Sequence, residues 1–171
     1  MPGNEILGEG RYLRLINEDG WEYVDRKRCT GVVLIVAVHE GKLILTEQRR
    51  RAVGTTVIEL PAGLVGDTEG NETESFVDAA KRELVEETGF EAGEMSLLCQ
   101  GPPSSGLSSE VVSLFLAEKL IRVGKGGGDE RENITVHEVP LDQIEPFAES
   151  ARKRGALVDP KIFAGVYFAK T

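Results

Sequence analysis

The residues best suited to chemistry are three glutamates, Glu83, Glu86 and Glu87, which stand at positions i, i+3 and i+4. On an α-helix this spacing places the three carboxylates on one face. Carboxylates packed this closely repel one another, and a divalent cation that prefers oxygen ligands, such as Mg²⁺, removes the repulsion. Arg82 lies beside them and can orient a carboxylate through charge-assisted hydrogen bonds. A solvated helix face that merely carries charge is the alternative, and it is the usual explanation for this spacing alone.

A helix must present these glutamates, and the sequence predicts it over the stretch Glu74 to Gly89. Asn71 and Glu74 have the spacing of a capping box at its start. Gly89 can end it, because glycine adopts the left-handed C′ conformation without a steric penalty. The apolar residues with helical spacing form its predicted buried stripe, which consists of Phe76, Val77, Ala80, Leu84 and Val85.

The run R82-E83-L84-V85-E86-E87-T88-G89-F90, with Glu74 eight residues before Arg82, resembles the signature of the Nudix hydrolases. That signature is a glycine, five residues, a glutamate, seven residues and then R-E-U-x-E-E-x-G-U, where U is apolar. Every position from Glu74 onward fits. The glycine is best matched by Gly63, so the loop from Gly63 to Glu74 carries ten residues instead of five. Lengthening a surface loop costs little free energy, and the resemblance therefore stands.

Other runs resemble one branch of that family, the ADP-ribose pyrophosphatases and their nucleoside-diphosphate-sugar relatives. The segment Ser104 to Glu110 resembles the S-P-G-x-S-x-E loop of this branch, with Ser105 in place of proline. The resemblance covers about residues 20 to 168. The runs that carry it are E47-Q48-R49-R50-R51-A52-V53-G54, I58-E59-L60-P61-A62-G63-L64, the loop S104-S105-G106-L107-S108-S109-E110, and D129-E130-x-E132-x-I134.

The resemblance implies a metal site and catalytic residues. Mg²⁺, for which Mn²⁺ can substitute, would be held by Glu83, Glu87 and Glu86, with the backbone carbonyl of Ala62 completing the shell. Arg82 would hold these carboxylates in place, and Glu86 and Arg82 would count among the catalytic residues. The number of metal ions stays open.

The resemblance also implies a general base and a set of substrate contacts. Glu110 would orient and deprotonate the attacking water, and an acid within residues 129–132 is the open alternative. The tryptophan would stack on the nucleobase and two arginines would contact the diphosphate. The implied substrate-binding residues are Trp21, Arg26, Arg50 and Glu59.

The implied reaction is metal-dependent hydrolysis of the diphosphate bond of a nucleoside diphosphate sugar such as ADP-ribose. The products would be a nucleoside monophosphate and a sugar phosphate. The alternatives within the family are GDP-mannose, a dinucleoside polyphosphate or a damaged nucleotide as the substrate. A domain that binds a nucleotide sugar without cleaving it is the alternative from another class.

The pattern of apolar runs predicts an α+β domain, and the resemblance implies a Nudix α/β/α sandwich with a mixed sheet. Asp19-Gly20, between two apolar-bearing runs, predicts an antiparallel hairpin over about residues 11–17 and 21–27. Strands are expected at about 30–38, 43–48, 56–60, 94–100, 111–120 and 134–139, a tight turn at 61–63, and helices at 141–155, in two pieces, and 160–169.

The chain is expected to divide into an N-terminal hairpin, residues 1–28, and a Nudix hydrolase domain, residues 29–171. A hairpin of two strands is only marginally stable by itself, so it must pack on the domain or on a second subunit. The resembled branch forms dimers in which this hairpin reaches the partner's site. A homodimer is therefore expected, and whether the hairpin swaps between subunits stays open.

Bulk properties exclude some partners. The formal net charge of −9 argues against nucleic acid, whose binders show a basic face. No run approaches the roughly 20 apolar residues that span a bilayer, so no membrane partner is expected. Cys29 and Cys99 are isolated and are predicted to be buried or partly buried thiols in a reducing compartment, which indicates a cytoplasmic location.

Overall fold

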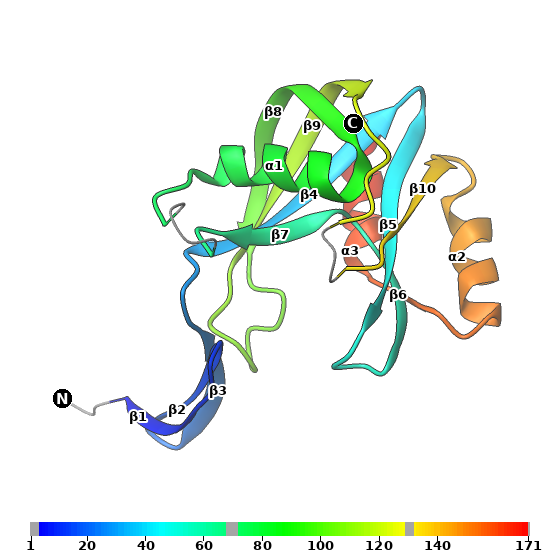
Figure 1. The fold of residues 1–171 in the computed structure, drawn as a ribbon. Coiled ribbons are helices and arrows are strands. Elements are labelled where there is room, and N and C mark those ends of the chain that lie inside the picture. Colours follow the sequence, from blue (N-terminus) through cyan, green and yellow to red (C-terminus); the bar gives the residue numbers. More distant parts are fainter. Residues whose placement is uncertain (1–3, 68–71, 129–131, 171) are drawn as a thin grey trace.

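The computed structural model describes residues 4–67, 72–128 and 132–170 of the chain, and Figure 1 shows their arrangement. A mixed eight-stranded sheet forms the centre, with the strand order β11-β6-β5-β4-β9-β8, while β10 pairs with β5 and β7 pairs with β4. Most neighbours are antiparallel, but β4 runs parallel to β9 and β11 runs parallel to β6. The strands are β4 (Gly31–His39), β5 (Lys42–Arg50), β6 (Thr55–Glu59), β7 (Ala62–Val65), β8 (Phe90–Gly101), β9 (Val112–Arg122), β10 (Thr135–Pro140) and β11 (Leu157–Val158).

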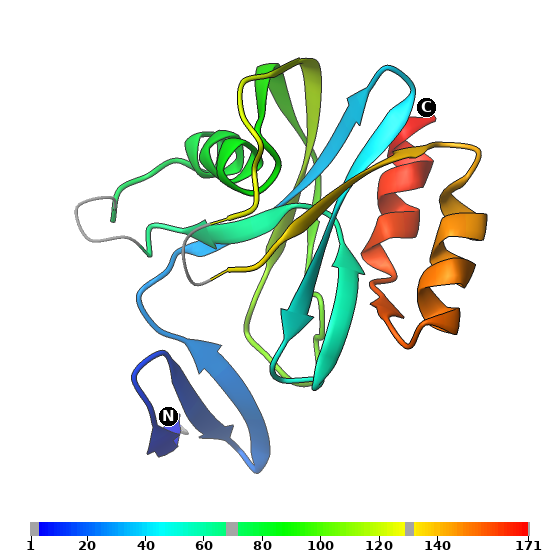
Figure 2. The same ribbon diagram turned by 45° about the vertical axis from the view of Figure 1, so that its right-hand side comes forward.

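Helices cover both faces of this sheet, as Figure 2 shows. Helix α1 (Phe76–Thr88) lies on one face, and α2 (Ile144–Lys153) and α3 (Lys161–Ala169) lie on the other. Strand β4 separates two apolar cores, because Val33 and Ile35 pack in the core with α1 while Leu34 and Val36 pack in the core with α2 and α3. This burial on both faces explains its continuous apolar sequence. The predicted α+β class and α/β/α sandwich are confirmed.

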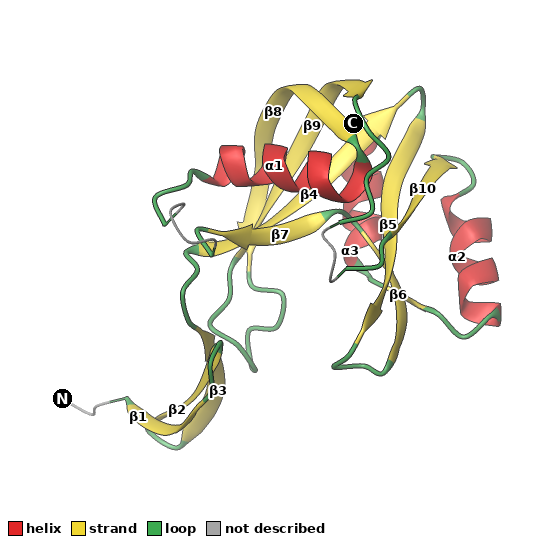
Figure 3. Ribbon diagram, in the orientation of Figure 1, coloured by secondary structure: helices red, strands yellow, loops and turns green. Residues whose placement is uncertain are grey.

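A separate antiparallel sheet projects from the central domain at the N-terminal end of the chain (Figure 3). It contains β1 (Glu5–Glu9), β2 (Leu13–Glu18) and β3 (Trp21–Arg26). The predicted hairpin is confirmed as β2 and β3, and its turn has φ of 53° at Asp19 and 88° at Gly20. Strand β1 was not predicted, because its residues show no alternation of apolar and polar side chains and all of them are exposed.

The start of helix α1 differs from the predicted capping box. Asn71 lies outside the described residues, and the helix begins only after Ser75. The Ser75 hydroxyl oxygen accepts a hydrogen bond of 3.1 Å from the Asp78 N–H group, which makes Ser75 the N-cap. The predicted end is confirmed, since Gly89 has φ of 73° and donates its N–H to the Val85 carbonyl.

Three further local predictions are corrected. Of residues 61–63, which were predicted as a tight turn, Ala62 and Gly63 belong to β7 and pair with β4. Strand β8 begins at Phe90, four residues earlier than expected. Cys99, on the edge strand β8, is exposed, whereas Cys29 is partly buried as expected. Among the described residues, no helix has the length and apolar character needed to cross a membrane.

Candidate active site

Arg82 is the centre of the carboxylate cluster on α1. Its guanidinium donates to both carboxylate oxygens of Glu74, at 2.9 and 3.0 Å, and to the Leu64 carbonyl at 3.1 Å. A further nitrogen donates to Glu83 at 2.7 Å and to Glu86 at 3.2 Å. The Glu74 carboxylate and then Glu83 raise the pKa of Arg82 above its ordinary value, so this cation is permanent. The structure therefore makes Glu74 a partner of Arg82 and not part of a helix cap.

Strand β7 lies so close to α1 that only glycine fits at position 63. A Cβ atom at Gly63 would stand 1.9 Å from Cδ of Glu83. The absence of a side chain lets the Glu83 carboxylate lie against the strand. This contact gives a physical reason for the glycine that precedes the glutamate helix.

Two of the three predicted metal-binding glutamates are shielded from solvent. Burial raises the pKa of Glu83 to about 7, and the nearby Glu86 and Glu132 carboxylates add to the effect. Burial likewise raises the pKa of Glu87 to about 8, with repulsion from Glu83 and Glu132 adding to it. Glu87 is 3% exposed, and its carboxylate accepts a hydrogen bond of 3.0 Å from the Ala62 N–H group.

These donors suit a hard divalent cation. Among the described residues, no three His, Cys, Asp or Glu side chains already form a metal-binding group. Arg82 and the Ala62 N–H group instead hold oxygens of Glu83, Glu86 and Glu87. Burial and mutual repulsion disfavour the ionised carboxylates, and a cation such as Mg²⁺ relieves both effects. The Ala62 backbone reaches Glu87 through its N–H group, and the predicted role of its carbonyl stays a prediction.

The glycine-rich segment 124–128 closes the C-terminal end of α1. Gly127 and Gly128 donate their N–H groups to the carbonyls of Glu87 and Glu86, at 2.8 and 3.0 Å. A Cβ atom at Gly126 would lie 2.4 Å from the carbonyl carbon of Thr88, so the two backbones touch. Glu132, which comes later in the chain, lies near enough to influence Glu83 and Glu87. Residues 129–131, which belong to the alternative set of acids, lie outside the described residues.

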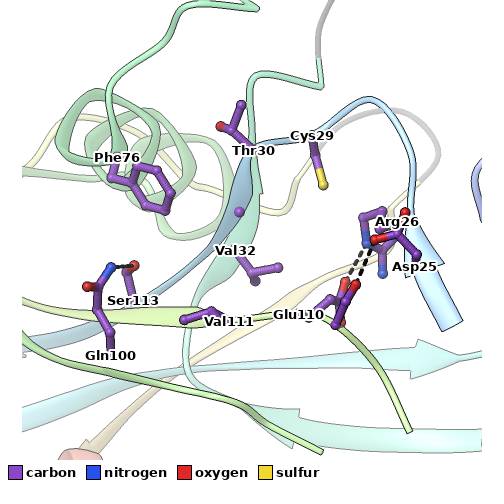
Figure 4. A pocket seen from close by; sticks show the side chains of 12 residues that line it. Asp25, Arg26, Cys29, Thr30, Val32, Phe76, Gln100, Glu110, Val111 and Ser113 are labelled. Carbon is purple, nitrogen blue, oxygen red and sulfur yellow. Dashed lines mark hydrogen bonds and ion pairs between the residues drawn. The ribbon is translucent and has the colours of Figure 1, made fainter. Parts of the chain in front are cut away.

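A second group of predicted site residues lies beside the N-terminal sheet. Nε of Arg26 donates to the Glu110 carboxylate at 2.5 Å. Both residues line a cavity of about 270 Å³ together with Asp25, Cys29 and Phe76, and Figure 4 shows the pair at its rim. Trp21, on the same sheet, is 63% exposed. The structure therefore places Glu110 against Arg26.

Arg50 and Glu59 form a third contact on the central sheet. They extend from β5 and β6, and Nε of Arg50 donates to the Glu59 carboxylate at 2.6 Å. Arg50 also lies near enough to Glu87 to favour the ionised form of that carboxyl. Arg50, a predicted diphosphate contact, therefore lies close to Glu87, a predicted metal ligand.

The sequence did not indicate that two residues near Glu110, Asp25 and Ser109, contact each other. Asp25 of β3 accepts a hydrogen bond of 2.7 Å from the Ser109 hydroxyl. The two residues stand 84 positions apart in the chain. Neither belongs to a spacing pattern, so no signal in the sequence indicated the contact.

The fold and the carboxylate helix define a class of protein, and comparison with known families identifies it. The model of the NUDIX domain family matches residues 27–160. The chain therefore belongs to the NUDIX family.

Two curated relatives show where the chain lies within this family. It is 38% identical over 122 residues to an ADP-ribose pyrophosphatase of Bacillus subtilis, which covers 70% of this chain and 63% of the relative. It is 35% identical over 137 residues to a GDP-mannose pyrophosphatase of Klebsiella pneumoniae, which covers 75% of this chain and 66% of the relative. The matched stretches thus span slightly less than two thirds of either relative's own length.

A solved structure supports the fold. The crystal structure of an ADP compounds hydrolase superposes with a TM-score of 0.72 at 20% sequence identity, covering 98% of this chain and 90% of that chain. The resemblance to the family that the sequence suggested is confirmed.

Proposed function

We propose that this chain hydrolyses the diphosphate bond of a nucleoside diphosphate sugar in a Mg²⁺-dependent reaction, with ADP-ribose as the first candidate substrate. The observation that carries the proposal is the Arg82 cluster. Its guanidinium contacts the carboxylates of Glu74, Glu83 and Glu86. Partial burial of Glu83 and burial of Glu87 raise the pKa of both carboxyls, and a divalent cation would stabilise their ionised forms. The similarity to proteins named ADP-ribose and GDP-mannose pyrophosphatases supports this substrate class.

Glu83, Glu86 and Glu87 are the residues that would hold Mg²⁺. A bound divalent cation supplies neutralisation of the diphosphate oxygens and a lower pKa for a coordinated water. Arg82 orients the carboxylates, and its contact with the Leu64 carbonyl fixes the guanidinium against β7. This arrangement holds the donors in place before the substrate arrives.

Glu110 acts as the general base. It takes a proton from the attacking water while one P–O bond of the diphosphate breaks, and the water oxygen becomes part of one phosphate product. The products are a nucleoside monophosphate and a sugar phosphate. Since Glu110 pairs with Arg26 here, its carboxylate must leave that guanidinium to meet the water. Glu132 is the alternative base among the described residues, because it lies near Glu83 and Glu87.

The substrate lies between the carboxylates of α1 and the residues beside the N-terminal sheet. Trp21 stacks on the nucleobase through its exposed ring, which is free to contact a planar partner. Arg26 and Arg50 contact the diphosphate, and Glu59 orients Arg50 through their hydrogen bond. The N-terminal sheet and the loops determine which nucleobase and which sugar the site accepts.

The chain works as a homodimer. Apolar side chains remain exposed across the projecting N-terminal sheet, which is unusual for a surface without a partner. These side chains are Ile6, Leu7, Tyr12, Leu13, Leu15 and Trp21. Light scattering should give twice the mass of 18.6 kDa, and a monomer at micromolar concentration would contradict this part of the proposal. The cytoplasmic location stays a prediction.

A substrate panel tests the proposed activity. ADP-ribose, ADP-glucose, GDP-mannose and diadenosine tetraphosphate are incubated with the chain and Mg²⁺, and monophosphate products are separated by chromatography. ADP-ribose should give AMP and ribose 5-phosphate, and EDTA should abolish turnover. Faster turnover of GDP-mannose would make GDP-mannose, and not ADP-ribose, the preferred substrate. Tight binding of a nucleotide sugar without products would instead identify a sensor.

A further inference from the structure

The loop that carries Glu110 is docked on strand β3 of the N-terminal sheet. The Val24 N–H group donates to the Leu107 carbonyl at 2.8 Å, and the Ser109 N–H group donates to the Val24 carbonyl at 3.0 Å. Together they form an isolated parallel bridge between Val24 and Ser108. The loop and the N-terminal sheet are therefore joined through their backbones.

A side-chain bond reinforces this bridge. The Ser109 hydroxyl donates to Oδ1 of Asp25 at 2.7 Å, while Oδ2 of Asp25 accepts from Nε of Arg14 at 3.1 Å. Ser109, and then Arg14, hold the pKa of Asp25 below its usual value. The aspartate is thus an ionised acceptor whose two oxygens have separate partners on β2 and on the loop.

Adjacent residues on the strand contact adjacent residues on the loop. Asp25 binds Ser109, and Arg26 binds the neighbouring Glu110 (Figure 4). Strand β9 begins at Val112, two residues after Glu110. Glu110 is therefore held between two fixed points, and only a short segment separates it from each. A short segment fixed at both ends gives a side chain few positions to sample.

We propose that Asp25 and Ser109 are positioning residues, which hold the Glu110 loop on the N-terminal sheet and so determine where Glu110 stands during the reaction. This inference rests on the proposed function of Glu110 as the general base. The role proposed for Asp25 and Ser109 is exerted through Glu110 and not through a contact with the substrate. Displacement of a reacting group by about 1 Å can lower a rate by about 100-fold, so a tether of this kind affects turnover more than substrate binding.

Steady-state kinetics of Ser109→Ala and Asp25→Ala test the proposal. Both variants should lower kcat for the best substrate of the panel by about 10- to 100-fold and change KM by less than about threefold. The double variant should be no slower than the slower single variant, because both changes remove the same bond. Ser109→Thr keeps the hydroxyl and should recover most of the rate. If Asp25→Ala does not fold, Ser109→Ala on the exposed loop removes the same bond.

Two matched variants serve as controls. Ser108→Ala removes a neighbouring hydroxyl that makes no hydrogen bond among the described residues and leaves the backbone bridge intact. Glu22→Ala removes an exposed carboxylate from β3, the strand that carries Asp25. Both controls should turn over like the wild type. Equal rates for the test and control variants, or a change confined to KM, would overturn the positioning role.

Trp21 provides a second readout that does not depend on turnover. It is the single tryptophan of the chain, and a Cβ atom at Gly106 of the loop would lie 3.9 Å from its ring. The emission of Trp21 should shift to longer wavelength in Ser109→Ala and Asp25→Ala but not in Ser108→Ala. Unchanged emission in both test variants would show that the loop stays docked without this bond and overturn the proposal. A wild type that cleaves no nucleotide sugar would instead overturn the proposed function, and the positioning role with it.

Discussion

Arg82 concentrates several roles in one side chain. It contacts Glu74, Glu83 and Glu86 and also reaches the Leu64 carbonyl on the neighbouring strand. A planar guanidinium with five N–H donors can satisfy such a set, whereas the single ammonium group of lysine cannot. This residue therefore links the helix that carries the carboxylates to the strand beneath it.

Glu87 is the glutamate of the cluster whose role can be tested most cleanly. Glu87→Gln keeps the shape and can still accept the Ala62 N–H hydrogen bond, but it cannot ionise. We expect kcat to fall by about 100-fold or more and Mn²⁺ binding, followed by electron paramagnetic resonance, to weaken. The matched control is Glu91→Gln, an exposed glutamate on β8. Metal binding and turnover at the control's level would remove Glu87 from the metal site.

Glu110→Gln separates the proposed general base from the proposed metal ligands. The amide cannot accept a proton, so kcat should fall by about 10²- to 10⁴-fold. Mn²⁺ affinity should remain at the wild-type value, because Glu110 contacts Arg26 and not the glutamates of α1. A rate near that of the wild type would transfer the base role to Glu132, and Glu132→Gln is the next variant to measure.

At the scale of elements, the approach of β7 to α1 sets the geometry of the site. Gly63→Ala would drive a methyl group into the Glu83 carboxylate, since the two would stand 1.9 Å apart. We expect a loss of about 1–3 kcal/mol in the free energy of unfolding, measured by chemical denaturation, together with weaker Mn²⁺ binding.

Two further variants decide whether this effect is local. Gly101→Ala is the control, because a Cβ atom there meets nothing within 4 Å. Adding Glu83→Asp to Gly63→Ala shortens the carboxylate and should recover part of the stability. If Gly63→Ala were as stable as the control and bound metal equally well, the close approach would have no role.

The sequence allowed α1 to be predicted, but not the strand beside it. The R-E-x-x-E-E-x-G pattern indicates both the carboxylate face and the glycine that ends the helix, because these features are local. Strand β7 contains Ala62 and Gly63 directly after a proline, a composition typical of turns. It becomes a strand only because β4 offers free backbone groups opposite it. Tertiary pairing thus overrides local preference.

In the candidate site, too, some contacts could be predicted from the sequence and others could not. The positions of Arg82, Glu83 and Glu87 follow from helical spacing, and their clustering could be predicted. The contacts of Asp25 with Ser109 and of Arg26 with Glu110 each join residues 84 positions apart. No periodic pattern encodes such a separation, so these contacts required the fold.

At the scale of the whole molecule, Glu47 ties the sheet to the helical layer that covers it. Its carboxylate accepts two hydrogen bonds from Arg154, the residue after α2, at 2.5 and 2.7 Å. Nε2 of His137 on β10 lies 2.7 Å from Oε2 of the same carboxylate. Arg154, and then His137, hold the pKa of Glu47 below its usual value.

This arrangement predicts a pH-dependent contribution to stability. Because the pKa of Glu47 is lowered on folding, its contribution is present above the ordinary carboxyl pKa and is lost as the pH falls through the lowered value. Glu47→Gln should therefore lower the free energy of unfolding by about 1 kcal/mol near neutral pH. The difference from the wild type should vanish in acid, as followed by urea denaturation at several pH values.

Glu149→Gln is the matched control for this measurement. Glu149 pairs with Lys153 on the exposed face of α2, and such surface pairs contribute little to stability. A difference between wild type and Glu47→Gln that stayed constant down to strongly acid pH would exclude titration of Glu47 as its cause.

The backbone bridge between Val24 and the loop also bears on how specificity can change over time. Residues 62–87 supply the predicted metal ligands, whereas strand β3 and the 104–110 loop bond to each other by main-chain groups. A graft of either segment alone from a relative would meet a foreign partner at that bridge. Exchanged together, the two segments form one transferable unit, which could carry a new substrate preference onto an unchanged α1 with its proposed metal ligands. Natural variation in the two segments should therefore be correlated.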